Sequence, residues 1–180
     1  MLKFDEEKQI SSVRGALALR KQIEDAADLV CGRGFRNICW LGIGGTWASC
    51  LQAVCHMKER TGIETFSSNA AEYCTTGDKR IGEGTYIILS SVTGSTIEII
   101  NAVKKAHESG ARVLGFIDDR EAPLAGIVDT CISYPGNEQL KFFMTADRFM
   151  KNEGVMPEYD HMYSQFDRCL PEALAEAEKS

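Results

Sequence analysis

The sequence predicts an α/β protein, a three-layer αβα sandwich built around a five-stranded parallel sheet. Three observations favour this class. Short apolar runs alternate with segments of helical period, a glycine closes most of the predicted helices, and 180 residues are enough to bury one core. Because parallel strands are joined by right-handed crossovers, the simplest order of the strands is 2-1-3-4-5, a flavodoxin-like arrangement.

Each predicted element follows from a local pattern, taken in chain order. Apolar residues at near-helical spacing predict a first helix over residues 5–30, which Gly32 and Gly34 end. Short, mainly apolar runs predict five strands: 37–41, 63–67, 86–89, 112–117 and 130–134. The segments between them predict three helices and one helical turn: 46–60, 69–75, 96–108 and 124–128. Two further helices are predicted near 138–152 and 160–178.

Composition and charge exclude several functional classes. The chain is 44% hydrophobic and 26% charged, has no long apolar run, and lacks the apolar core of a signal peptide at its N-terminus. Its net charge of −6, with no basic cluster larger than Lys104-Lys105, argues against nucleic-acid binding. The seven cysteines contain no Cys-x-x-Cys pair, and the three histidines have no metal-ligand spacing. We therefore expect a cytoplasmic protein with reduced thiols, without a membrane span, a metal or an organic cofactor.

The loop after the third predicted strand indicates an anion site. Between Ser90 and Thr96 the chain places five hydroxyl side chains and one glycine directly before a helix. Backbone N–H groups of a first helical turn, the helix dipole and rotatable hydroxyl donors all favour a negative ligand, so we interpret this loop as a phosphate cradle. Ser95 and Glu98 also have the spacing of a helix capping box, but capping leaves the other hydroxyls unexplained. No Gly-Lys-Ser/Thr follows, so the loop is not a P-loop.

A second glycine-rich loop, Gly42-Ile-Gly-Gly-Thr46, follows the first predicted strand. In the predicted strand order, strands one and three are neighbours at the topological switch point, so the two loops converge in one crevice. The same loop begins like a Gly-x-Gly-x-x-Gly dinucleotide fingerprint. Trp47 occupies the place of the third glycine, which argues against a dinucleotide site.

At these two loops, over roughly residues 35–150, the sequence resembles the sugar isomerase (SIS) domain family of phosphosugar-binding proteins. The resemblance lies in the glycine-rich turn and in the run Ser91-Val-Thr-Gly-Ser-Thr96, with Glu98 two places on. Downstream, the run Ala122-Pro-Leu-Ala125 resembles the Ser-Pro-Leu-Ala turn of the family, and Asp129 resembles the Ala-Asp pair that follows this turn. The variant of the loop is most similar to the branch of amino-sugar and fructosamine 6-phosphate deglycases, which is related to the isomerase half of glucosamine–fructose-6-phosphate aminotransferase.

The resemblance implies a binding role for residues of both loops. Hydroxyl groups would donate to the phosphate, backbone N–H groups would complete the cradle, and two glycines would let the chain pass close to the sugar. The hydroxyl donors implied are Thr46, Ser91, Thr93 and Thr96. The N–H groups implied are those near Val92, Gly94 and Ser95, and the two glycines are Gly44 and Gly45.

The resemblance also implies an isomerase or deglycase that acts on a ketose or aminosugar 6-phosphate by acid/base proton transfer at C1 and C2. Glu72, after the second predicted strand, and Glu138, after the fifth, are the candidate acids, although each is also explained as an acid in the first turn of a helix. No residue of the chain matches the catalytic Glu/His pair of the family. A phosphosugar-sensing module without catalysis, or a dinucleotide-binding enzyme, remains an alternative.

The relatives usually carry two SIS domains in tandem, with the acid/base residues largely in the second. We therefore expect residues 1–35 to form an N-terminal helix, 36–155 the SIS domain, and 156–180 a helical segment that links to a missing second SIS domain. The other possibility is a single-domain member that completes its site as a homodimer.

Overall fold

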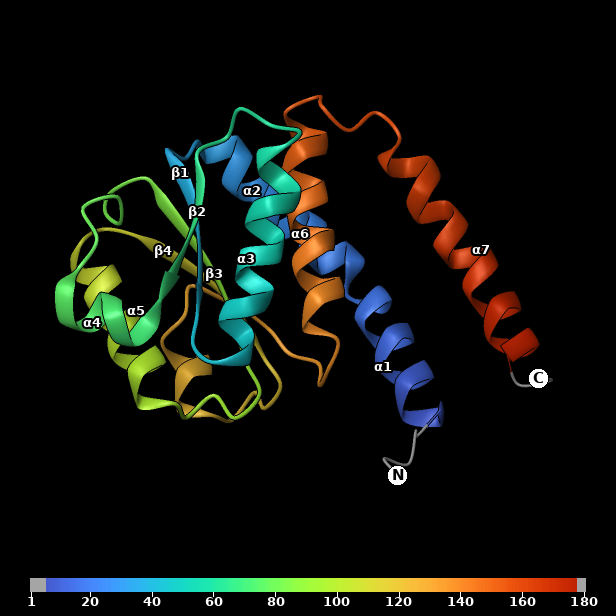
Figure 1. Ribbon diagram of the computed structural model, residues 1–180, viewed down its shortest axis with the longest axis horizontal. Helices are drawn as coiled ribbons and strands as arrows, with labels where there is room; N and C mark the ends of the chain where they lie inside the picture. The colour runs from blue at the N-terminus through green and yellow to red at the C-terminus, as the bar shows by residue number, and fades with distance from the viewer. Residues whose placement is uncertain (1–5, 178–180) are drawn as a thin grey trace.

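A computed structural model of the protein describes residues 6–177. They form a five-stranded, all-parallel sheet in the order β2-β1-β3-β4-β5, with helices on both faces (Figure 1). The strands are β1 (Asn37–Gly42), β2 (Thr65–Asn69), β3 (Thr85–Ser91), β4 (Arg112–Ile117) and β5 (Thr130–Ile132). The helices are α1 (Glu6–Ala18), α2 (Arg20–Arg33), α3 (Gly45–Lys58), α4 (Ala70–Thr76), α5 (Ile97–Glu108), a 3-10 turn η1 (Pro123–Gly126), α6 (Glu138–Asn152) and α7 (Tyr159–Ala177). The predicted fold class and strand order are confirmed.

Each face of the sheet has its own hydrophobic core, because side chains alternate along a strand. In β1, Ile38 and Trp40 enter a core shared with α2, α3 and α6. Cys39 and Leu41 enter a second core, shared with α4 and α5. Trp40 is fully buried, and its indole N–H donates to Thr65 Oγ1 at 3.1 Å. Strands covered on both faces read as continuous apolar runs, which is why they were visible in the sequence.

Most boundaries differ from the prediction by one to three residues, and two of the differences concern the first helix and the second strand. The single helix expected over 5–30 is broken at Leu19 into α1 and α2, and the second strand begins at Thr65 rather than at residue 63. Leu19 is 6% exposed and belongs to the first core, so the break turns α1 across the end of α6 while both helices keep an apolar face. Neither glycine nor proline marks the break, and helical periodicity continues through it, so the sequence carries no signal for it. The outermost parts of the predicted terminal segments, residues 1–5 and 178–180, lie outside the described residues.

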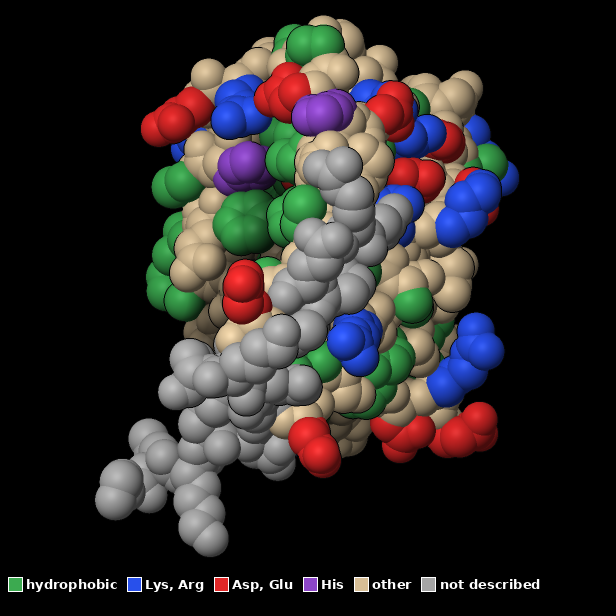
Figure 2. Space-filling view, turned by 90° about the vertical axis from the view of Figure 1, so that its right-hand side faces the viewer, with side chains coloured by type: hydrophobic (Ala, Val, Ile, Leu, Met, Phe, Trp, Pro, Cys, Tyr) green, Lys and Arg blue, Asp and Glu red, His purple; other side chains and the backbone are tan. Residues whose placement is uncertain are grey.

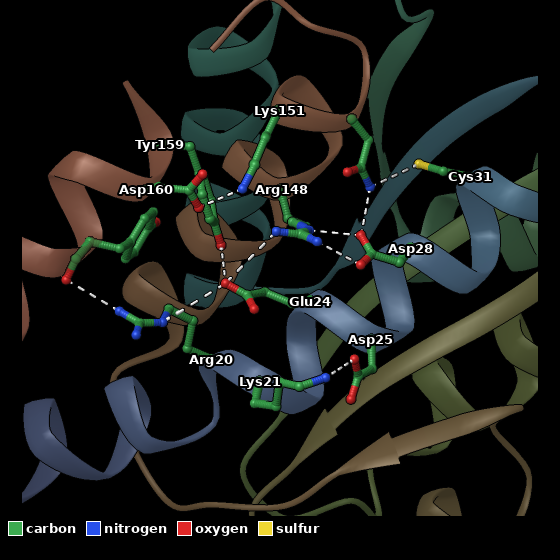
Figure 3. Close-up of polar contacts among 12 residues, drawn as sticks. Arg20, Lys21, Glu24, Asp25, Asp28, Cys31, Arg148, Lys151, Tyr159 and Asp160 are labelled. Carbon is green, nitrogen blue, oxygen red and sulfur yellow. Dashed lines mark hydrogen bonds and ion pairs between the residues drawn. The ribbon is translucent and has the colours of Figure 1, made fainter. Parts of the chain in front are cut away.

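Polar contacts between α2, α6 and α7 hold the start of α7 against the rest of the domain (Figure 3). Arg148 on α6 donates to both carboxylate oxygens of Asp28 on α2, at 2.7 and 2.6 Å. This guanidinium holds the pKa of the Asp28 carboxyl below its ordinary value. Tyr159, the first residue of α7, donates its hydroxyl to Glu24 at 2.9 Å. Beyond this anchor α7 runs away from the sheet towards the C-terminus (Figure 1).

A second anchor of α7 is the buried carboxylate of Asp147 on α6. It accepts a hydrogen bond from the Tyr163 hydroxyl at 2.7 Å and contacts His56 Nε2 on α3 at 2.6 Å. The His56 ring packs edge-on against Phe143, with 5.0 Å between centroids. His56 therefore has a structural role at the far end of α3.

The described helices include none that is both long and apolar enough to cross a membrane. All seven cysteines are free thiols. On α3, Cys50 is buried and Cys55 is exposed, so the two do not share a face of the helix.

Candidate functional site

The loops that leave β1 and β3 lie next to each other, because these two strands pair along their length. The chain turns sharply after β1 at Gly44, whose φ of 58° favours glycine, and α3 begins at Gly45. The start of α3 thereby lies beside the loop 91–96 at the carboxyl edge of the sheet. Open parallel sheets bind ligands at such a switch point.

A cavity of about 430 Å³ lies at this edge. It is formed by residues at or just after the carboxyl ends of β1, β3, β4 and β5, and its volume is within the range of small-ligand sites. The lining residues are Gly45, Thr46, Ser49, Ser90, Val92, Asp118, Gly136, Asn137, Glu138, Gln139 and Lys141.

The loop after β3 is held in shape by its own hydroxyl groups. Ser91 Oγ accepts the Gly94 N–H at 3.0 Å, and Thr93 Oγ1 accepts the Ser95 N–H at 3.3 Å. Each hydroxyl can still donate its proton to a ligand oxygen. Gly94 has a φ of 57° and lies so close to Ala122 that an added Cβ would overlap the Ala122 Cβ. Gly94 therefore lets the loop pack directly against the chain after β4.

The capping box that the spacing of Ser95 and Glu98 allows does not form at the start of α5, so the alternative interpretation of this loop as a helix cap is not supported. The N-cap is Thr96, not Ser95, and the Thr96 side chain makes no capping hydrogen bond. Ser95 lies one residue before the N-cap, and its own N–H donates to Thr93 Oγ1 at 3.3 Å. The first turn of α5 therefore has no capping side chain, which is the condition under which helix N–H groups are open to an anion.

Acidic groups form the opposite wall of the cavity. Glu138, the first residue of α6, accepts a hydrogen bond from Thr46 Oγ1 at 2.9 Å. Asp118 follows β4 and accepts the Gly136 N–H at 3.2 Å. Its other oxygen lies 3.5 Å from the Lys141 ammonium. Thr46 and Glu138 are thus joined although they leave different strands.

The structure brings some of the expected residues to the cavity and leaves others near it. Those that line it are Gly45, Thr46, Val92 and the candidate acid Glu138. Others belong to the same two loops without lining it: Gly44, Ser91, Thr93, Gly94, Ser95 and Thr96. Glu72 is exposed in the first turn of α4, after the N-cap Asn69, and is not a lining residue.

Several lining residues were not anticipated from the sequence. Asp118 could have been found, because it directly follows a predicted strand and so lies at the carboxyl edge. Asn137 and Lys141 carried no signal, because a short loop and a lysine on a helix both predict exposure to solvent. Elsewhere, His107 pairs with Asp129 at 2.9 Å and does not line the cavity.

Comparison with known proteins identifies a family match for the chain. The sequence pattern of the SIS domain matches residues 34–145, which is more than half of the chain and includes every residue lining the cavity. No curated protein matches the sequence significantly.

Solved structures share the fold at low sequence identity. The C-terminal domain of glucosamine-fructose-6-phosphate aminotransferase from Francisella tularensis has a TM-score of 0.73 and 12% identity, over 96% of this chain and 54% of that chain. A protein of E. coli CFT073, solved as a complex, has a TM-score of 0.62 and 13% identity, over 89% and 100%. Glucosamine-6-phosphate deaminase from Thermotoga maritima has a TM-score of 0.60 and 17% identity, over 90% and 54%.

The chain spans about half the length of the first matching structures, from 48% to 56%. At these identities the structural likeness shows the fold alone. The sequence match shows the family, since it covers 34–145 and the whole candidate site. The chain therefore belongs to the SIS domain family.

Proposed function

We propose that this chain is the phosphosugar-binding SIS domain of an enzyme that isomerises or deglycates a ketose or aminosugar 6-phosphate. One observation carries the proposal: a cavity at the carboxyl edge of the sheet lies beside the hydroxyl-rich loop, which contributes Ser90 and Val92 to its lining, and faces a wall that contains the carboxylates of Asp118 and Glu138. The first side suits a phosphate, and the second suits proton transfer and hydroxyl groups. The names of the similar structures, an aminotransferase domain and a deaminase of 6-phosphosugars, support this substrate class.

The phosphate would bind at the loop between β3 and α5. Hydroxyl groups of Ser91, Thr93 and Thr96 would donate to it, together with the backbone N–H near Val92. The other expected donors already have protein partners: the Thr46 hydroxyl donates to Glu138, and the N–H groups of Gly94 and Ser95 donate to Ser91 Oγ and Thr93 Oγ1. Each of these would have to exchange its protein partner for the phosphate. Two features of the structure support this arrangement. Thr93 is exposed, and the start of α5 lacks a capping side chain. Both leave donors available at a place where the helix dipole favours a negative charge.

Glu138 is the candidate general base within this chain. Its carboxylate lines the cavity, and the hydrogen bond from Thr46 orients it. A base that removes a proton from a sugar carbon must reach it within hydrogen-bond distance, and the position of Glu138 across the cavity from the loop allows this. Glu72 is the weaker candidate, because it is exposed and does not line the cavity.

A partner, either a second SIS domain or a second copy of the chain, would complete the site. Four large apolar side chains are exposed near the cavity: Trp47 and Leu51 on α3, and Val92 and Ile97 around the hydroxyl loop. On the face that carries α7, hydrophobic side chains also gather beside two histidines (Figure 2). Exposed apolar groups around a pocket are typical of an interaction surface. The helix α7, which leaves the body after its anchored start, would then lead to the second domain.

A non-catalytic phosphosugar sensor is the second candidate function. It is favoured by one observation: no histidine is among the residues that line the cavity in the described part of the chain. A sensor and an enzyme would bind the same ligands, and only turnover distinguishes them.

The test is calorimetric titration and thermal unfolding with fructose 6-phosphate, glucosamine 6-phosphate and a fructosamine 6-phosphate. The same sugars without phosphate are the controls. Ligand at about 100 times its Kd should raise the free energy of unfolding by about 2.7 kcal/mol. Stabilisation by the phosphorylated sugars alone supports the proposal. Stabilisation by NAD and by none of the sugars would contradict it.

A further inference from the structure

Lys141 lies at the candidate site and is almost completely buried, with 1% of its surface exposed. It follows Glu138 by three residues on α6, so both lie on the same side of the helix. Its ammonium group donates to the Tyr134 carbonyl at 2.7 Å and lies 3.5 Å from Asp118 Oδ1. It also lies 5.8 Å from the centroid of the Phe116 ring.

Burying an ammonium group is costly unless its partners compensate for lost water. Burial lowers the pKa of Lys141, and the charges of Asp118 and Glu138 partly offset this effect. Lys141 is the only cation among the described residues that line the cavity. A hydrophobic residue would fill this position without the cost of desolvating a charge. The presence of an ammonium group is therefore explained by the protein groups that it binds.

The segment that Lys141 holds is the loop between β5 and α6. This loop adopts left-handed backbone conformations at two consecutive residues, Gly136 with a φ of 82° and Asn137 with a φ of 51°. Among the described residues, Asn137 is the one non-glycine residue with a positive φ. Such a conformation persists only where surrounding contacts determine it.

Three contacts determine the loop. Lys141 binds the carbonyl of Tyr134 at its start, and Asp118 binds the N–H of Gly136 at its middle. The Tyr134 hydroxyl donates to Ser11 O on α1 at 3.0 Å. Lys141 also contacts Asp118, so it joins two of the three anchors. The residue that follows this loop is Glu138.

We propose that Lys141 is a positioning residue of the site: by holding Tyr134 and Asp118 it fixes the loop 134–137, and thereby places Glu138 against Thr46 and towards the ligand. The ligand part of this inference rests on the proposed function, and the loop part does not. Lys141 acts through protein groups rather than on the ligand, because its buried ammonium is engaged by the Tyr134 carbonyl and by Asp118.

The first test needs no ligand. Amide hydrogen exchange of the full chain would be compared between the wild type, Lys141→Met and the control Lys151→Met, which removes a lysine from the other end of α6. Lys141→Met should raise exchange in the segment 134–138 by about tenfold, since one lost anchor at about 1.4 kcal/mol corresponds to that factor. Lys151→Met should leave this segment unchanged. Unchanged exchange in Lys141→Met would overturn the proposal.

Lys141→Met leaves Asp118 without its cation and can fail to fold for that reason. The double variant Lys141→Met/Asp118→Asn removes both charges and keeps an acceptor for the Gly136 N–H. It should fold and still show faster exchange at 134–138, because the anchor on the Tyr134 carbonyl is absent. Wild-type exchange in the double variant would also overturn the proposal.

The second test is a mutant cycle with Glu138→Gln, read by titration with fructose 6-phosphate and with inorganic phosphate. If Lys141 acts through Glu138, Lys141→Met should raise the Kd for the sugar phosphate about tenfold and hardly change that for phosphate. In the Glu138→Gln background the same substitution should add less than about twofold. If Lys141→Met raised the Kd by the same factor in the wild type and in the Glu138→Gln background, the positioning role would be refuted. A wild type that binds no sugar phosphate would refute the proposed function instead, and hydrogen exchange would still decide the role of Lys141.

Discussion

Replacing Gly94 with alanine tests the structure of the hydroxyl loop most directly. Gly94 has a φ of 57°, and an added Cβ would overlap the Ala122 Cβ and lie 2.9 Å from the Ile117 Cγ2. Its carbonyl also accepts the Leu124 N–H at 3.0 Å, which ties the loop to the turn η1. The Gly94→Ala substitution therefore combines backbone strain with a steric clash against a rigid part of the fold.

The expected loss of stability is the sum of two terms. A left-handed conformation costs a residue with a Cβ about 1–2 kcal/mol. Inserting a methyl group into a packed contact costs about 1–3 kcal/mol, because the Ala122 Cβ is bonded directly to the backbone and Ile117 belongs to β4, so neither moves without the chain around it. Gly94→Ala should therefore reduce the free energy of unfolding by about 2–5 kcal/mol.

Gly154→Ala is the matched control. Gly154 has a φ of 84°, and nothing lies within 4 Å of the position of its Cβ. This control should lose only the strain term, about 1–2 kcal/mol. The assay is urea unfolding of both variants, with unchanged slope as the sign that the unfolded state is the same. Equal losses in the two variants would refute the clash with Ala122, and with it the close packing of the loop on the turn after β4.

Three further predictions concern single side chains. Thr93→Val should keep the fold and weaken binding of fructose 6-phosphate by about 1–3 kcal/mol in calorimetry, because a donor to a charged ligand is lost, while Thr75→Val on α4 should leave affinity unchanged. Ser95→Ala should change the free energy of unfolding in urea by less than about 0.5 kcal/mol, since Ser95 does not cap α5, and a loss near 1 kcal/mol would restore the capping role. Arg148 lowers the pKa of Asp28, so the pair stabilises the fold above the unfolded carboxyl value of 3.8, and this stability is lost as the pH falls from there through the lower pKa of the folded state. The unfolding free energy of Asp28→Asn should therefore fall less steeply than that of the wild type between about pH 5 and pH 3.

The sheet was predictable because its determinants are local and repetitive. Apolar runs such as 86–89 mark strands that are covered on both faces, and the right-handed crossover rule then leaves few strand orders. The same rule brings the loops at Thr46 and Ser91 together, so the position of the crevice followed from topology before any side chain was placed. The break at Leu19 was not predictable, because it arises from packing in the core and leaves the helical period intact.

The finer features of the site depend on contacts that sequence spacing does not encode. The helix α5 starts one residue later than expected, with Thr96 as its N-cap, and Ser95 lies in the preceding loop with its N–H bonded to Thr93. The burial of Lys141 depends on Asp118, a residue on a different strand end. Glu138 and Thr46 were each candidates from the sequence, whereas the hydrogen bond between them became visible only in the structure.

The hydrogen bond between Thr46 and Glu138 spans 92 positions of the sequence. During synthesis the glycine-rich loop that carries Thr46 therefore emerges well before Glu138, and the cavity closes only after β5 and α6 have docked on the sheet. Contacts at such separation form late in folding, because the chain between them must be ordered first. A ligand that bridges the two walls would recognise only the finished domain, and would stabilise it by a free energy that grows with the logarithm of the ligand concentration.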